Sequence, residues 1–148
     1  MHSELSIHIN ATLPRIFEVA ADLENWPSFL PHYIRNEYFS RSTWGGIINM
    51  SCHRPPFKLA WTSIYRVDST NRTLYFEHLR PLTRGMKVLW KFEPQPDKSV
   101  KVIIVHDFTL PWPIIGPWVA RFIVGNFLIE HVARKTLRHL KAKVEGTS

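Results

Sequence analysis

The chain has 148 residues, of which 45% are hydrophobic and 13% aromatic, and this composition excludes a disordered chain. The length suits one domain, residues 1–148, with a substantial core. A formal net charge of +7 fits nucleic acid, anionic lipid or an acidic protein as partner. No nucleic-acid-binding motif accompanies the charge, so we expect no nucleic-acid partner.

The sequence also bears on where the protein resides. Residues 1–7 lack the basic start and continuous apolar core of a signal peptide. The most apolar window, Pro113–Ile129, contains proline, arginine, glycine and asparagine, so it does not fit a membrane span of about 20 mainly apolar residues. The single cysteine, Cys52, cannot form an intramolecular disulfide and is expected to serve packing. We therefore expect a soluble, cytoplasmic protein.

The chain up to His32 predicts one strand and two short helices. Leu5, Ile7 and Ile9 alternate with polar residues, which is typical of a half-buried strand. Thr12 is the expected N-cap of a helix that ends near Ala21 and has a proline in its first turn. Two prolines interrupt residues 22–32, which leaves room for at most a second short helical turn.

From Tyr33 onward the pattern predicts a ladder of six strands. Turn residues separate them, among them Gly45-Gly46 and Pro55-Pro56. Connections this short imply antiparallel hairpins in sequence order. The predicted strands are Tyr33–Arg41, Ile47–Arg54, Phe57–Ser69, Thr73–Leu79, Met86–Glu93 and Ser99–Leu110.

The C-terminal part predicts one long amphipathic helix from about Trp118 to Val144. Apolar residues recur there at steps of three and four, with Pro117 at the start and Gly146 beyond the end. The opposite side is basic, which indicates either a solvated face or a docking surface for an acyl carrier protein or an anionic membrane. Its basic residues are Arg121, Arg134, Lys135, Arg138 and Lys141.

An antiparallel sheet curled against this long helix would cover the apolar faces of both elements. The sequence therefore predicts an α+β fold in which seven strands surround one helix. Such an arrangement leaves a cavity between the concave sheet and the helix, which is a plausible ligand site.

Four segments carry a family resemblance: Asp22–Pro27, Thr83–Phe92, Val105–Phe108 and Pro111–Gly116. Together with the order of elements, they resemble the polyketide cyclase/dehydrase group of the START/Bet v 1-like superfamily. The resemblance covers essentially the whole chain and implies a helix-grip fold. The superfamily includes cyclases, lipid carriers and quinone-binding proteins. For the segment Trp112–Trp118 we keep three interpretations open: a lid, a lipid-surface contact or a buried connection.

Strand alternation selects the side chains that face the expected cavity. Most are aromatic or aliphatic, which favours flat or elongated apolar ligands, although ordinary core packing explains any single tryptophan. The expected ligand-binding residues are Trp26, Leu30, Trp61, Ser63, Phe76, Met86, Trp90, Ile104, Phe122 and Asn126.

Four polar side chains on the inward faces are candidate catalytic donors or bases: Tyr33, Tyr65, His78 and His106. Aldol cyclisation and dehydration need a donor that polarises a carbonyl and a base near an acidic α-carbon. By resemblance, Tyr33 matches a pocket tyrosine of the aromatic polyketide cyclases. Tyr65 stands where those cyclases place a pocket arginine, so the strongest electrophilic group of the family is missing here.

Other chemistries have less support in the sequence. No glycine loop fits a phosphate, and the eight histidines show no metal-ligand spacing, so we expect no cofactor and no metal. His106 and Asp107 are adjacent on a strand and point to opposite faces, which excludes a simple dyad. Two functions remain open. One is a cyclase/aromatase-type enzyme, and the other is a non-catalytic carrier or chaperone for a lipid, isoprenoid or quinone.

Overall fold

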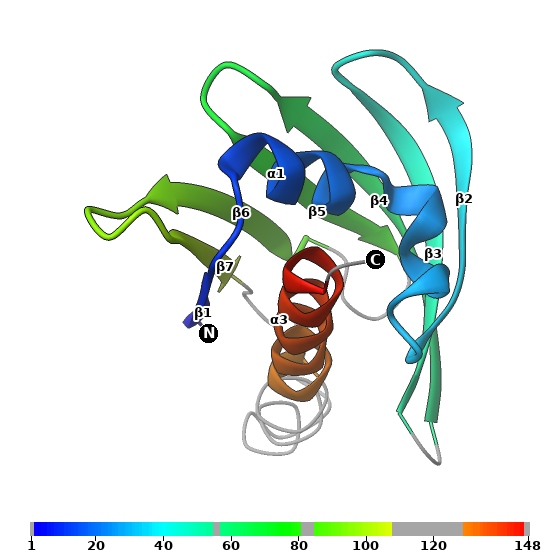
Figure 1. Ribbon diagram of the computed structural model, residues 1–148. Helices are drawn as coiled ribbons and strands as arrows, with labels where there is room; N and C mark the ends of the chain where they lie inside the picture. Colours follow the sequence, from blue (N-terminus) through cyan, green and yellow to red (C-terminus); the bar gives the residue numbers. More distant parts are fainter. Residues whose placement is uncertain (1, 55–56, 81–84, 108–128, 147–148) are drawn as a thin grey trace.

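A seven-stranded antiparallel sheet curves around a C-terminal helix in the computed structural model, which describes residues 2–54, 57–80, 85–107 and 129–146 (Figure 1). Two short helical elements, α1 and η1, follow the first strand and lie across one end of the sheet. The elements are β1 (His2–Ile9), α1 (Leu13–Ala21), η1 (Leu23–Ser28), β2 (Tyr33–Arg41), β3 (Gly45–Arg54), β4 (Phe57–Asp68), β5 (Thr73–Arg80), β6 (Lys87–Pro94), β7 (Val100–Asp107) and α3 (Glu130–Glu145).

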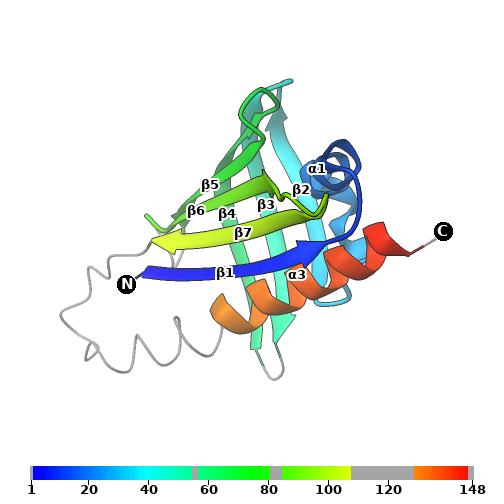
Figure 2. The same ribbon diagram turned by 60° about the vertical axis from the view of Figure 1, so that its left-hand side comes forward.

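The strand order is β1-β7-β6-β5-β4-β3-β2, and every neighbouring pair is antiparallel. Strands β2 to β7 therefore follow one another as hairpins, which confirms the predicted ladder. Strand β1 instead pairs with β7, with Leu5 opposite Ile104. Figure 2 shows these two strands side by side next to α3.

The predicted helices are confirmed within the described residues. Thr12 occupies the N-cap of α1, but its side chain makes no capping hydrogen bond. The last helix ends at Glu145, and the N–H of its C-cap residue Gly146 donates to Ala142 O at 2.9 Å. The predicted helix start near Trp118 and the segment Trp112–Trp118 lie outside the described residues. In the described part of the chain, no helix is long and apolar enough to cross a membrane.

The predicted turn at Gly45-Gly46 is wrong, because both glycines belong to β3. The turn lies one step earlier, where the backbone N–H and the hydroxyl of Ser42 both donate to Gly45 O, at 2.8 and 2.6 Å. A Cβ on Gly46 would lie 2.2 Å from Ser40 O, and one on Gly45 would lie 2.5 Å from Tyr65 O. The glycines therefore permit close backbone approach between strands rather than a reversal of the chain.

Helix α3 is fixed to the sheet by apolar packing and by polar contacts with β1. Leu137 and Leu140 are buried on its inner face. Lys141 Nζ donates to His8 O and binds Glu145, both at 2.7 Å, and Glu145 also accepts from Asn10 N at 2.7 Å. Lys141 therefore does not belong to a freely solvated basic face.

Candidate functional site

A cavity of about 360 Å³ lies between the concave face of the sheet and α3. Its wall is mostly apolar, and every strand from β2 to β7 contributes to it. The described residues that line it are Trp26, Tyr33, Met50, Cys52, Lys58, Leu59, Ala60, Trp61, Phe76, His78, Met86, Val88, Trp90, Ile104, His106, Ile129, Val132, Ala133 and Thr136.

Trp26 of η1 is the centre of an aromatic cluster at this cavity. Its indole Nε1 donates to Ala20 O at 2.9 Å, which fixes the orientation of the ring. The ring centroids of Tyr33, Trp90 and Phe76 lie 5.1, 5.5 and 6.1 Å from that of Trp26. Such contacts favour a rigid wall of ring faces and edges, which suits a flat or elongated apolar ligand.

Two histidines, His78 on β5 and His106 on β7, place imidazole nitrogen atoms in this apolar wall. Burial lowers the pKa of His78 to about 3, with a smaller contribution from His106. Burial also lowers the pKa of His106 to about 4, although Asp107 acts in the opposite direction. Both imidazoles are therefore neutral near pH 7, with one N–H and one lone-pair nitrogen each. Among the described residues, His106 Nδ1 is buried without a hydrogen-bond partner.

A set of hydroxyl and imidazole groups lies where β2 meets α3. Burial raises the pKa of Tyr33 well above its ordinary value, while a hydrogen bond with Thr136 acts in the opposite direction. The Tyr33 hydroxyl therefore keeps its proton and can donate a hydrogen bond. Thr136 Oγ1 donates to Val132 O at 2.7 Å and lies 2.8 Å from His32 Nε2. This pairing orders the polar side of the cavity.

The structure brings most of the predicted site residues together. Of the predicted catalytic residues, Tyr33, His78 and His106 line the cavity. Of the predicted ligand-binding residues, the cavity is lined by Trp26, Trp61, Phe76, Met86, Trp90 and Ile104. Phe122 and Asn126 lie outside the described residues.

Three predicted residues, Leu30, Ser63 and Tyr65, are buried but are not among the described residues that line the cavity. The ring of Tyr65 packs instead against Tyr38 of β2, with the centroids 5.5 Å apart. Alternation identifies the face of a strand on which a side chain lies, but not which part of that face borders the cavity.

Sequence reasoning missed Met50 and Cys52 on β3 and Thr136 on α3. Met50 pairs with Trp61 and Cys52 with Leu59, so the register between β3 and β4 would have identified them. Burial raises the pKa of Cys52 to about 12, which keeps the thiol protonated and argues against a thiolate nucleophile. Within the described residues, no group of three or more His, Cys, Asp or Glu side chains could hold a metal ion.

Several solved structures share this fold over nearly their whole length. The aromatase/cyclase Zhui from Streptomyces sp. R1128 superposes with a TM-score of 0.88 at 17% identity, covering 98% of this chain and 93% of its own. A protein from Thermus thermophilus superposes with a TM-score of 0.85 at 20% identity, covering 100% of this chain and 99% of its own. A STAR-related lipid transfer protein from Xanthomonas axonopodis superposes with a TM-score of 0.72 at 14% identity, covering 97% of this chain and 85% of its own. At these identities the likeness establishes the helix-grip fold.

The sequence itself identifies the family. The comparison with curated proteins found no match. A family profile described as "Polyketide cyclase / dehydrase and lipid transport" matches residues 9–141, from the end of β1 to the last turns of α3. The resemblance to the polyketide cyclase/dehydrase group is thereby confirmed, and the chain belongs to the polyketide cyclase/dehydrase and lipid transport family.

Proposed function

We propose that the protein binds a flat aromatic or polyketide-like molecule in the cavity and assists its cyclisation and dehydration. The observation that carries this proposal is the buried imidazole of His106, which lines an aromatic cavity with an unpartnered Nδ1 among the described residues. A neutral imidazole in that position is available to a ligand for proton transfer or for a hydrogen bond.

The proposed reaction divides the work between a donor and a base. Tyr33 donates a hydrogen bond to a ketone oxygen, and His106 removes a proton from the adjacent carbon, which gives an enolate. The enolate carbon then forms a bond with a second carbonyl carbon of the same chain. The resulting alkoxide takes up the proton from His106, and the hydroxyl group leaves with a neighbouring proton as water. His78 is a second base, and we assign no direct contact to Tyr65.

A second function, a carrier for a lipid, isoprenoid or quinone, has support of its own. With a pKa of about 3 for His78 and about 4 for His106, both imidazoles are weak bases. The relatives also include a protein described as a lipid transfer protein. In a carrier, the same polar groups would only orient a headgroup.

Two tyrosine variants separate enzyme from carrier. Tyr33→Phe removes a hydroxyl from a residue that lines the cavity, whereas Tyr65→Phe removes a buried hydroxyl that does not. If Tyr33 and His106 are catalytic, Tyr33→Phe and His106→Ala will slow turnover of a poly-β-keto substrate by about 10²–10⁴ and leave its affinity within a few-fold. If they only orient a headgroup, affinity will fall by up to about tenfold with no turnover to lose.

The controls define failure. Tyr65→Phe is expected to preserve both affinity and turnover. If the wild-type protein binds the substrate without conversion above the spontaneous background, the enzyme proposal fails and the carrier remains. If flat polyphenols, quinones and fatty acyl compounds all fail to bind, both functions fail.

A further inference from the structure

The wall of the cavity is uncharged except at one point. Among the described residues that line it, Lys58 is the one lysine, and there is no arginine, aspartate or glutamate; the Lys58 side chain is exposed. The two histidines of the wall are neutral because burial lowers the pKa of each. The interior therefore suits an uncharged ligand body, and the only charged contact from a described lining residue comes from one exposed lysine.

Lys58 lies at an edge of the cavity and not deep within it. Four consecutive residues, Lys58 to Trp61, line the cavity, although successive side chains of a strand point to opposite faces. In the described ladder, β4 pairs with β5 only from Thr62 onward, where Thr62 lies opposite Arg80. The edge of β4 at residues 58–61, and not only its inner face, therefore borders the cavity, and the exposed Lys58 marks a solvent-facing side of it, the mouth.

A second lysine, Lys135 of α3, lies next to residues that line the cavity. Lys135 is adjacent to Thr136 and one helical turn after Val132, and both of these line the cavity. After burial, Lys135 makes the next largest contribution to the lowered pKa of His32, so its charge lies near that residue.

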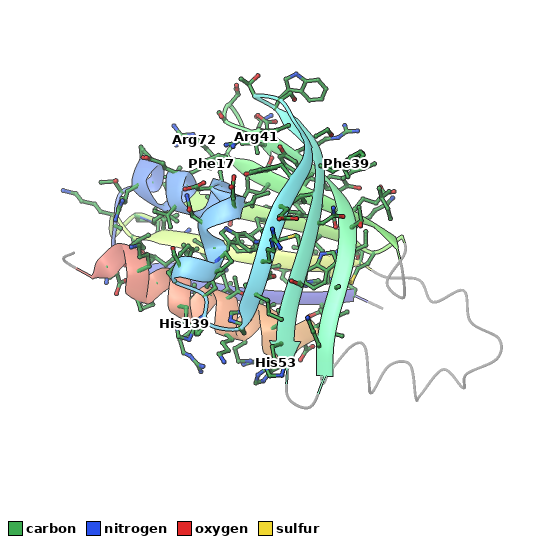
Figure 3. The ribbon with its side chains drawn as sticks, turned by 90° about the vertical axis from the view of Figure 1, so that its right-hand side faces the viewer. Phe17, Phe39, Arg41, His53, Arg72 and His139 are labelled. Atoms are coloured by element: carbon green, nitrogen blue, oxygen red, sulfur yellow. The ribbon has the colours of Figure 1, made fainter. Side chains whose placement is uncertain are left out.

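A backbone hydrogen bond links His32, which lies near the Lys135 charge, to the strand position opposite Lys58. His53 N donates to His32 O at 2.7 Å, and His53 lies directly opposite Lys58 in the ladder. Figure 3 shows His53 near the ends of β3 and β4, where the two strands extend past α3. Lys58 thus lines the cavity from the sheet, and Lys135 lies on the helix next to the lining residue Thr136.

Neither lysine is compensated by a described acidic group. Where the chain is described, Arg35, Arg41 and Lys141 each have a carboxylate partner, but Lys58 and Lys135 have none within ion-pair distance. Two cations without a carboxylate partner among the described residues, close to an uncharged cavity, favour a ligand whose own charge is negative and terminal.

We infer that the ligand is an amphiphilic anion: its uncharged body occupies the cavity, and its terminal carboxylate or phosphate ester stays at the mouth beside Lys58 and Lys135. The inference rests on the proposed function, because it names the class of ligand for the same cavity. It also fixes the direction of entry, with the apolar end leading towards His78 and His106.

Three ligands with one alkyl chain test this inference: dodecanoate, dodecyl phosphate and dodecanol. We expect both anions to bind more tightly than the alcohol, by about two- to fivefold for each of the two lysines. Lys58→Gln and Lys135→Gln should each remove about that factor from the affinity of the anions and leave dodecanol unchanged. Added salt should reduce the difference between the anions and the alcohol, because exposed charges are screened. Isothermal titration calorimetry measures all three affinities.

Arg134→Gln is the matched control, because it removes one positive charge from an exposed position of α3 beside Lys135. It should preserve the preference for anions, and unchanged dodecanol binding shows that each variant is folded. The inference is overturned if dodecanol binds as tightly as the anions, or if Arg134→Gln weakens anion binding as much as the lysine variants do. A preference for only one anion supports the inference and identifies its end group. Failure of all three ligands to bind would overturn the inference, whereas the proposed function fails only if flat polyphenols and quinones do not bind either.

Discussion

The imidazole of His78 lies parallel to the indole of Trp61, with the ring centroids 5.4 Å apart and the planes inclined by 8°. A protonated imidazole would gain about 0.5–2 kcal/mol from such a ring face. Burial nevertheless lowers the pKa of His78 to about 3, a shift that corresponds to several kcal/mol. Desolvation therefore outweighs the attraction, and the stacked pair is uncharged near pH 7.

The buried histidines predict a loss of stability in mild acid. Burial lowers the pKa of His32 and His106 to about 4 and that of His78 to about 3. Each residue binds fewer protons in the folded state than in the unfolded chain, so stability falls as the pH drops from about 6.5 towards the folded pKa values. Each histidine should cost about 1–2 kcal/mol at a pH of about 5. Urea unfolding at several pH values measures this slope.

The matched variants for this prediction are His106→Leu and His53→Gln. The first removes a buried histidine and should make the dependence on pH less steep. The second removes an exposed histidine on β3 and controls for the loss of a histidine as such. Equal slopes in the wild type and in His106→Leu would contradict the assignment of the buried neutral state to His106.

The strand pattern was sufficient to predict the order of elements and most of the cavity wall. Trp61, Phe76 and His106 lie on inward faces because the side chains of a strand alternate with a period of two. The same rule could not separate Tyr65 from the wall residues, because the ring of Tyr65 turns towards Tyr38.

Contacts between distant segments could not be predicted in this way. Thr136 occupies the apolar face of α3, where a lone hydroxyl gives little signal in the sequence. It is placed by its contact with His32, which lies 104 residues away along the chain. Gly45-Gly46 was misassigned because both a turn and a close approach of strands favour glycine. Only the positions of Ser40 and Tyr65 decide between the two.

The tryptophans of the cavity predict a saturable fluorescence response to flat ligands. Trp26, Trp61 and Trp90 line the cavity, whereas Trp44 is 67% exposed at the hairpin of β2 and β3. A quinone or flat polyphenol that binds in the cavity should change the emission of the first group. Trp61→Phe should reduce this saturable change, and Trp44→Phe should not. If the response were linear in ligand concentration and disappeared in Trp44→Phe, surface contact would explain it instead.

Gly46 predicts a large local cost for one added methyl group. The new Cβ would lie 2.2 Å from Ser40 O, a backbone atom that cannot rotate away. Gly46→Ala should therefore destabilise the protein by about 1–3 kcal/mol, as overpacking typically does. Thr43→Ala changes an exposed residue of the adjoining turn and should cost less than about 0.5 kcal/mol. Denaturant unfolding compares the two, and equal stability of both variants would contradict the close approach of the strands.

The outer side of α3 tests the proposed docking to an acyl carrier protein or an anionic membrane. Arg134 and Arg138 are exposed, and Lys141 is excluded from this test because it binds His8 O and Glu145. Arg134→Glu with Arg138→Glu should abolish binding to anionic vesicles or to an acidic carrier protein and preserve the melting temperature. Binding by the wild type should weaken with salt, because exposed charges are screened within about 8 Å at physiological ionic strength. Lys141→Glu should instead lower the melting temperature, since it breaks the contact between α3 and β1. Vesicle cosedimentation at two salt concentrations measures the binding of the wild type and of the double arginine variant. If the double variant binds as well as the wild type, this face of α3 is only a solvated surface.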